Sequence, residues 1–140
     1  MSQARLSNDE RAQLLKAARD AVKRAYAPYS NFRVGAAVLT EKGFLVTGCN
    51  VENASYGLTV CAERAAIVSA VAKEGAEMRI KAIAVVNDSG SDCPPCGACR
   101  QVIFEFGPDA IVIFQSHGGV EEMHILELLP RGFARREHSL

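Results

Sequence analysis

Two short segments of this chain carry cysteines at spacings that suit a metal ion. Cys61 stands two residues before Glu63, and Cys96 and Cys99 form a Cys-x-x-Cys pair further along the chain. Three protein ligands leave the fourth position of a tetrahedral zinc ion open for water, which is the arrangement of catalytic rather than structural zinc sites. The pattern therefore predicts one zinc ion per chain, held by Cys61, Cys96 and Cys99.

The residues beside the cysteines indicate what such a zinc ion would do. Bound zinc lowers the pKa of its water to about 7, so hydroxide is available as a nucleophile. Glu63 can reach that water without being a ligand, and it can carry a proton from water to a leaving amine. Three thiolates carry more charge than three imidazoles, and Arg64 could offset that excess. A ligand two residues before a glutamate, followed by Pro-Cys-x-x-Cys, is an established signature of zinc deaminases.

Cys93 complicates the ligand count because it creates a Cys93-x-x-Cys96-x-x-Cys99 series. That spacing also suits a closed four-sulfur zinc site or an iron–sulfur cluster, so a non-catalytic binding module is the alternative from another functional class. The two prolines after Cys93 favour an extended chain, and we expect this thiol to lie outside the ligand sphere. Glu63 favours the enzyme, since a structural site has no use for a carboxylate there. The histidines lack partners at ligand spacing and are expected at the surface: His117, His124 and His138.

The elements that must position these residues alternate between helix and strand. Ser7 and Glu10 match a capping box, and apolar residues at helical spacing follow them. The patterns predict helices at about 8–26, 61–74 and 96–106, a hairpin of strands 34–40 and 44–49, buried strands 80–86 and 110–114, and a weaker strand and helical turn within 120–129. This order indicates an α/β layered domain with a mixed sheet. Cys61 and Cys96 then fall at helix starts, where the positive end of the helix favours thiolate.

Length and composition favour one domain that handles small molecules. The chain has 140 residues, of which 49% are hydrophobic, so we expect a single domain over residues 1–140 with a sizeable core. Basic and acidic residues both number 16, which gives no positive excess for binding a nucleic acid polymer. The polar N-terminus and the lack of a long apolar run predict a cytoplasmic protein without a membrane partner. Five cysteines without an export signal argue for metal or catalytic use rather than disulfides.

The chain resembles the small, homotetrameric cytidine deaminases that act on free nucleosides and bind zinc with three cysteines. The likeness covers roughly residues 25 to 130 and lies in APYS (27–30), FRVGAA (32–37), GCNVENASY (48–56), CAER (61–64), PCGACRQ (95–101) and ELLP (127–130). It implies a three-layer α-β-α domain with a mixed five-stranded sheet. It also implies hydrolytic deamination of cytidine and 2'-deoxycytidine to uridine and 2'-deoxyuridine in pyrimidine salvage.

The resemblance implies further roles around the pyrimidine base. Glu63 would read the ring nitrogen and the exocyclic amine while it shuttles protons. The main-chain amide of Ala62 would donate to the base carbonyl, and Phe32 would pack against the ring. Phe133 would reach the base from a neighbouring subunit, because members of this family are tetramers with shared active sites. Arg131-Gly132 replaces the more usual run of small residues before this aromatic.

The ribose end of the nucleoside would meet Asn50, Val51 and Glu52. An amide and a carboxylate offer the donors and acceptors that ribose hydroxyls need. On sequence grounds alone, these residues could also be ordinary loop residues, because asparagine is frequent in turns. The nearest rival within the enzyme class is a deaminase of a cytosine-nucleoside antibiotic such as blasticidin S. The segment 50–53 favours an unmodified ribose over that rival.

Overall fold

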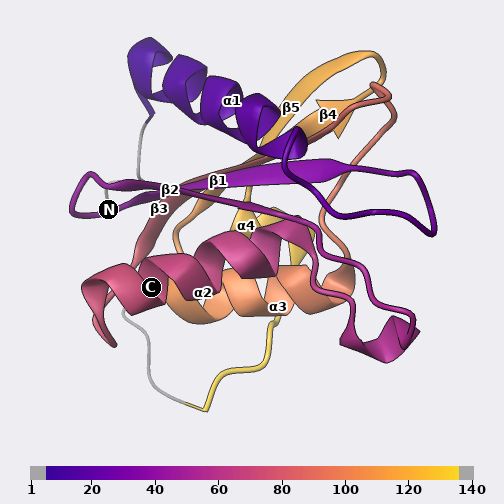
Figure 1. Ribbon diagram of the computed structural model, residues 1–140. Coiled ribbons are helices and arrows are strands. Elements are labelled where there is room, and N and C mark those ends of the chain that lie inside the picture. The colour runs from indigo at the N-terminus through magenta and orange to yellow at the C-terminus, as the bar shows by residue number, and fades with distance from the viewer. Residues whose placement is uncertain (1–5, 136–140) are drawn as a thin grey trace.

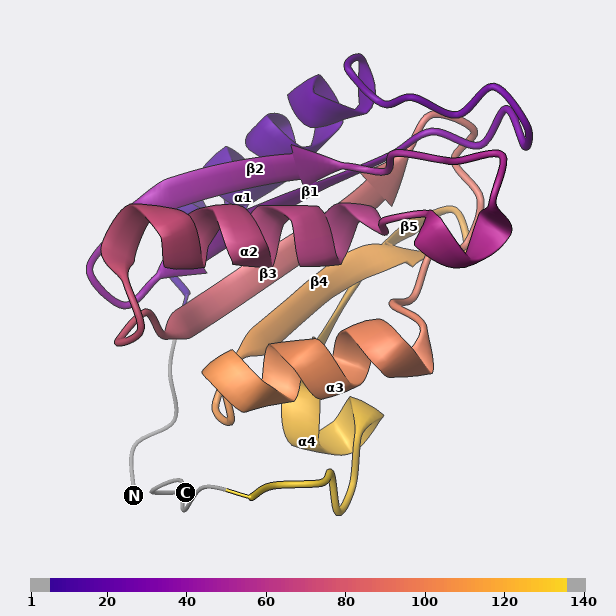
Figure 2. The same ribbon diagram turned by 60° about the horizontal axis from the view of Figure 1, so that its bottom comes forward.

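The computed structural model describes residues 6–135, in which a five-stranded sheet lies between two layers of helices. Helix α1 covers one face of the sheet, and α2, α3 and the short α4 lie on the other (Figures 1 and 2). This arrangement confirms the predicted three-layer α-β-α architecture. The strands are β1 (Val34–Thr40), β2 (Leu45–Cys49), β3 (Ile80–Asn87), β4 (Ile111–Ser116) and β5 (Gly119–His124). The helices are α1 (Asn8–Val22), α2 (Ala62–Glu74), α3 (Gly97–Phe106) and α4 (Ile125–Leu128), with a 3₁₀ turn, η1 (Tyr56–Leu58).

The sheet is mixed, and its strands lie in the order β2-β1-β3-β4-β5. Strand β1 pairs antiparallel with both β2 and β3, while β3 and β4 are parallel and β5 is antiparallel to β4. Strands β2, β3 and β4 therefore run in one direction, with α2 and α3 as the crossovers between them. The predicted hairpin that leads into parallel strands through helices is confirmed. Since both crossover helices follow strands of the same direction, they begin at the same edge of the sheet.

The central strands divide the core into two clusters. Ala36 and Val38 of β1 join the cluster beneath α2 and α3, whereas Ala37 and Leu39 join the cluster beneath α1. All seven residues of β1 are buried, as expected of a strand covered on both faces. Small residues let α1 approach closely: a Cβ on Gly35 would lie only 2.1 Å from the carbonyl oxygen of Ala18.

The first helix begins as predicted but ends earlier. The Ser7 side chain accepts from the Glu10 N–H and the Glu10 carboxylate accepts from the Ser7 N–H, so the capping box is confirmed. The predicted end near residue 26 is wrong, since α1 ends at Val22. The Tyr26 N–H instead donates to the Asn50 carbonyl, and Tyr26 forms a parallel bridge with Val51. A partner distant in the sequence thus overrides the local helical spacing.

The remaining boundaries lie within one or two residues of those predicted, and the weak segment 120–129 is confirmed as β5 followed by α4. His124, within this segment, has a structural role that the sequence pattern did not reveal. His124 is the N-cap of α4, and its Nδ1 accepts a hydrogen bond from the Leu126 N–H at 3.1 Å. His117 is exposed beside β5, and His138 lies outside the described residues.

Gly48 sets how closely β2 packs on α2. A Cβ at Gly48 would lie 2.3 Å from the backbone nitrogen of Ala66, so a side chain there must push the helix from the strand. We expect Gly48→Ala to lower the free energy of unfolding by about 1–3 kcal/mol or more in urea denaturation. Gly57→Ala is the matched control, because a Cβ at Gly57 meets no atom within 4 Å. Equal losses of stability in the two variants would contradict this account.

Candidate metal centre

The starts of α2 and α3 bring the three predicted zinc ligands together. Cys61 is the N-cap of α2 and Cys96 the N-cap of α3, and neither thiol hydrogen-bonds to the backbone of its helix start, so both sulfurs can bind a metal. Cys99 lies in the first turn of α3. The three Sγ atoms lie within 4.8 Å of one another, close to the spacing that one ion with Zn–S bonds of about 2.3 Å requires. Cys99 is buried and Cys96 is exposed, so the cluster is open on one side.

The chemistry of the cluster suits a cation. The pKa of Cys61 is lowered to about 5, first because Cys99 hydrogen-bonds to its sulfur and then because Arg64 is close. The pKa of Cys99 is raised, first by that same hydrogen bond and next by its burial. Cysteine binds a metal as thiolate, so a cation bound to all three sulfurs must displace any thiol proton. Three thiolates at two helix starts form the soft, negatively charged donor set that zinc prefers.

Arg64 faces this cluster from the first turn of α2. Its Nη2 donates to the Cys61 Sγ at 3.2 Å, and this contact raises the pKa of the guanidinium. The Arg64 Nε atom is buried and has no hydrogen-bond partner among the described residues. A guanidinium held here lies where it could offset the negative charge of the thiolates, and its role as a charge-tuning residue stays a prediction.

Glu63 is buried at the same helix start, with only 6% of its surface exposed. Burial raises the pKa of this carboxyl group, and the negative charge of Cys61 raises it further. A carboxyl group in this state holds a proton more readily than an exposed one, as an acid–base group must. Ala62, just before it, is the first residue of α2, so its N–H has no acceptor within the helix and can bind a ligand oxygen.

Cys93 lies apart from the sulfur group that the described residues form. Its side chain packs against the core cluster beneath α2 and α3, and burial raises the pKa of its thiol. Its N–H donates to the Gln115 carbonyl at 2.9 Å, which ties the loop before α3 to β4. This placement agrees with the prediction that Cys93 lies outside the ligand sphere.

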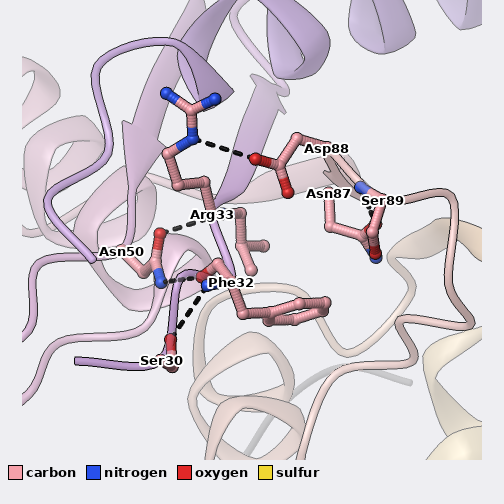
Figure 3. A network of polar contacts seen from close by, with 8 residues as sticks. Ser30, Phe32, Arg33, Asn50, Asn87, Asp88 and Ser89 are labelled. Carbon is pink, nitrogen blue, oxygen red and sulfur yellow. Dashed lines mark hydrogen bonds and ion pairs between the residues drawn. The ribbon is translucent and has the colours of Figure 1, made fainter. Parts of the chain in front are cut away.

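Asn50 holds the segment that carries Phe32 (Figure 3). Its Oδ1 accepts from the Val34 N–H at 2.9 Å, and its Nδ2 donates to the Phe32 carbonyl at 2.8 Å. Phe32 is half-buried against the core cluster, and its ring points away from Asn50. The amide of Asn50 retains one N–H and one lone pair for a ligand. Asn50, which is predicted to bind ribose, therefore also stabilises the backbone around Phe32.

Glu52 organises the neighbouring loop in a similar way. Its carboxylate accepts from the N–H groups of Tyr29 and Ser30, at 2.9 and 3.2 Å, and from the Ser30 hydroxyl. The hydroxyl contact is the main reason why the pKa of Glu52 is lowered. Val51, between Asn50 and Glu52, is exposed. Glu52 lines an open cavity with Tyr29, Ser30, Asn53, Tyr56 and Thr59.

A polar network that the sequence did not reveal joins the Phe32 segment to the loop before α3 (Figure 3). Arg33 Nε lies 2.9 Å from Asp88 Oδ2, and the Asp88 N–H donates to the Arg33 carbonyl. Asn87 shapes the same loop, because its Oδ1 accepts from the N–H groups of Ser89 and Ser91. These contacts hold the chain that leads to the Cys-x-x-Cys pair. Phe133, by contrast, is 68% exposed on the C-terminal segment.

The zinc-binding region of cytidine and deoxycytidylate deaminases matches residues 8–115 of this chain. The chain belongs to this family. A cytidine deaminase of Halalkalibacterium halodurans is 44% identical to this family member over 130 residues, which cover 91% of this chain and 97% of the relative. The crystal structure of a cytidine deaminase from Burkholderia pseudomallei has a TM-score of 0.80 and 47% identity, and covers 91% of this chain and 100% of that one. A blasticidin-S deaminase of Bacillus cereus is 33% identical over 73% of this chain and 77% of its own length.

Membership of the cytidine and deoxycytidylate deaminase family confirms several predictions at once. Zinc is the cofactor, and the three-cysteine group that the fold brings together fits it. The chain is a zinc-dependent deaminase rather than the non-catalytic zinc or iron–sulfur module that Cys93 left open. The roles of individual residues remain predictions.

The ligand set can be tested by its metal content. We expect Cys93→Ser to retain about one zinc ion per chain, because this thiol lies outside the sulfur group. The matched variant Cys96→Ser should lose most of its zinc, since it removes one of three ligands. Elemental analysis of the purified proteins measures both. Loss of zinc from Cys93→Ser would show that the ligand set is wrong.

Proposed function

We propose that this chain hydrolyses cytidine and 2'-deoxycytidine to uridine and 2'-deoxyuridine, with Glu63 as the proton shuttle. The observation that carries the proposal is a buried carboxyl group of raised pKa beside three clustered thiols. The relatives named cytidine deaminases support the choice of substrate. A structural zinc site would leave Glu63 without a function.

The chain's own residues account for the proton movements of the reaction. Zinc, when bound by the three cysteines, supplies a Lewis acid that makes water nucleophilic near neutral pH. Deamination adds water to the ring carbon that bears the amine and expels ammonia, so protons from water must reach the substrate nitrogens. Glu63 accepts and returns them, since burial raises its proton affinity. The Ala62 N–H orients the base by donating to its carbonyl oxygen.

The nucleoside is bound at its two ends by loops that are already ordered. Phe32 packs against the pyrimidine, because Asn50 fixes the carbonyl of Phe32 and the N–H of Val34 on either side of Arg33. The ribose hydroxyls use the remaining donor and lone pair of Asn50 and the one lone pair that Glu52 has left after it accepts from Tyr29 and Ser30. Val51 contributes an exposed apolar side chain between them.

The assembly is part of the same proposal. We infer a homotetramer of single-domain chains, 1–140, in which active sites are shared and Phe133 reaches a neighbouring site. Its side chain is exposed, as are several apolar residues around η1, and such groups mark interaction surfaces. The apolar residues are Tyr26, Tyr29, Val51, Tyr56, Leu58 and Val60. We place the enzyme in cytoplasmic pyrimidine salvage because its substrates are free nucleosides. Within residues 6–135, no helix has the length and apolar character that crossing a bilayer requires.

Replacement of Glu63 tests the proton shuttle. Glu63→Gln should lower kcat for ammonia release from cytidine by about 10²- to 10⁴-fold, because the amide cannot carry a proton. Zinc content should remain at one ion per chain in this variant. Glu105→Gln, the same change on α3, should keep the wild-type rate. A Glu63→Gln variant that retained most of the wild-type kcat would contradict the proposal.

Measurement of kcat/KM for each substrate tests whether the enzyme prefers a nucleoside or a nucleoside antibiotic. We expect cytidine and 2'-deoxycytidine to differ by about tenfold or less in kcat/KM, since one hydroxyl contact is worth about 0.5–1.5 kcal/mol. Blasticidin S should be the poorer substrate, because segment 50–53 favours an unmodified ribose. Faster turnover of blasticidin S than of cytidine would favour the relation to the 33%-identical blasticidin-S deaminase instead.

A further inference from the structure

Gln101 binds both polar groups of the Phe133 backbone. Its Nε2 donates to the Phe133 carbonyl at 2.7 Å, and the Phe133 N–H donates to its Oε1 at 3.2 Å. The two bonds join residues that are 32 positions apart in the sequence. Paired bonds to one residue fix its orientation as well as its position, as a single bond does not. Gln101 lies on α3, two residues after Cys99.

The chain that leads to Phe133 is also held against α3. Arg100 Nη1 donates to the Leu128 carbonyl at 2.9 Å, and its Nε donates to the Pro95 carbonyl at 2.7 Å. Arg131 has a φ of 61°, a left-handed conformation that residues other than glycine rarely adopt. A Cβ on Gly132 would lie 2.7 Å from a side-chain carbon of Leu129. The segment is thus bent sharply and kept close to the helix.

These ties do not bury the aromatic ring that they position. Phe133 is 68% exposed, although both its backbone polar groups are fixed. An exposed phenylalanine on a fixed backbone is pre-organised for contact with something outside its own chain, because little further ordering is needed on binding. The yellow stretch that follows α4, up to residue 135, lies on the side of α3 and α4 away from the sheet (Figure 2).

We propose that Gln101 is a positioning residue for deamination, which sets the place of Phe133 against the nucleoside in a second copy of the chain. The inference rests on the proposed function, in which Phe133 contacts a neighbouring active site. It adds a physical connection between two active sites. Helix α3 starts at Cys96 and contains Cys99 of one metal centre, and it also fixes the aromatic ring that contacts the nucleoside bound by a neighbouring chain. Gln101 acts through Phe133 and touches no reacting atom.

A residue that acts only through an aromatic contact should affect binding rather than chemistry. Phe133→Ala should raise KM for cytidine about tenfold, the equivalent of about 1.4 kcal/mol, with kcat little changed. Gln101→Met keeps the side-chain length without either hydrogen bond and should raise KM by about three- to tenfold. Gln101→Glu still accepts from the Phe133 N–H, but it places a second acceptor oxygen against the Phe133 carbonyl, so its KM should also be raised.

The decisive measurement is a double-mutant cycle on KM. If Gln101 acts through Phe133, then Gln101→Met combined with Phe133→Ala should have the KM of Phe133→Ala alone, because the position of the missing ring no longer matters. Zinc content, thermal midpoint and oligomer mass are measured for every variant. Glu105→Gln is the control, since Glu105 lies one turn further along α3 and makes no hydrogen bond to segment 129–133 among the described residues.

The outcomes separate this inference from the function on which it rests. Absence of cytidine turnover in the wild type overturns the proposed function and the inference with it. A normal KM in Phe133→Ala overturns the aromatic contact, and Gln101 then has nothing to position. A raised KM in Phe133→Ala with a normal KM in Gln101→Met, or multiplied effects in the double variant, overturns only the role of Gln101. If Gln101→Met loses zinc, Gln101→Glu decides: a raised KM with full zinc supports the role, and a normal KM overturns it.

Discussion

Three sulfur atoms held within 4.8 Å of one another concentrate negative charge that a partly buried site can accept only with positive groups around it. The fold supplies two of these from the backbone, as the starts of α2 and α3, and one from a side chain, as the Arg64 guanidinium. Because Cys61 and Cys96 are the N-caps themselves, the ligands lie at the positive ends of the helices. The position of a single cation thus depends on where two helices begin.

The sheet topology explains why these helices begin together. Strands β2, β3 and β4 share one direction, so the helices that follow β2 and β3 both start at the edge where those strands end. Close packing then limits their movement, since Gly48 brings β2 against the backbone of α2. Glu63, one residue further into α2 than Ala62, is also buried, and burial raises its pKa. The three thiols and the Glu63 carboxyl group consequently lie at the same edge of the sheet.

Most of the element boundaries that could be predicted from the sequence are set locally in the chain. The capping box of Ser7, the hairpin and both helix starts depend on neighbouring residues, and the structure confirms them. The end of α1 could not be predicted, because Tyr26 pairs with Val51 rather than continuing the helix. The same holds for the Arg33–Asp88 pair and the Gln101–Phe133 pairing, whose partners are 55 and 32 positions apart. The PCGACRQ motif indicates that Gln101 lies near the cysteines, but it does not reveal Phe133 as its partner.

The residues assigned to the nucleoside also hold the loops that would receive it. Asn50 uses both ends of its amide on the backbone around Phe32, and Glu52 accepts three hydrogen bonds from Tyr29 and Ser30. A ligand can use only the donors and lone pairs that the Asn50 amide and the Glu52 carboxylate have left. Because both groups are already hydrogen-bonded to the backbone, their directions are fixed before a ligand binds. Fixed groups lose little side-chain freedom on binding, which favours affinity for a small polar ligand. It follows that hydrogen bonds within and between the 26–34 and 50–53 segments fix the shape of the proposed nucleoside site before substrate arrives.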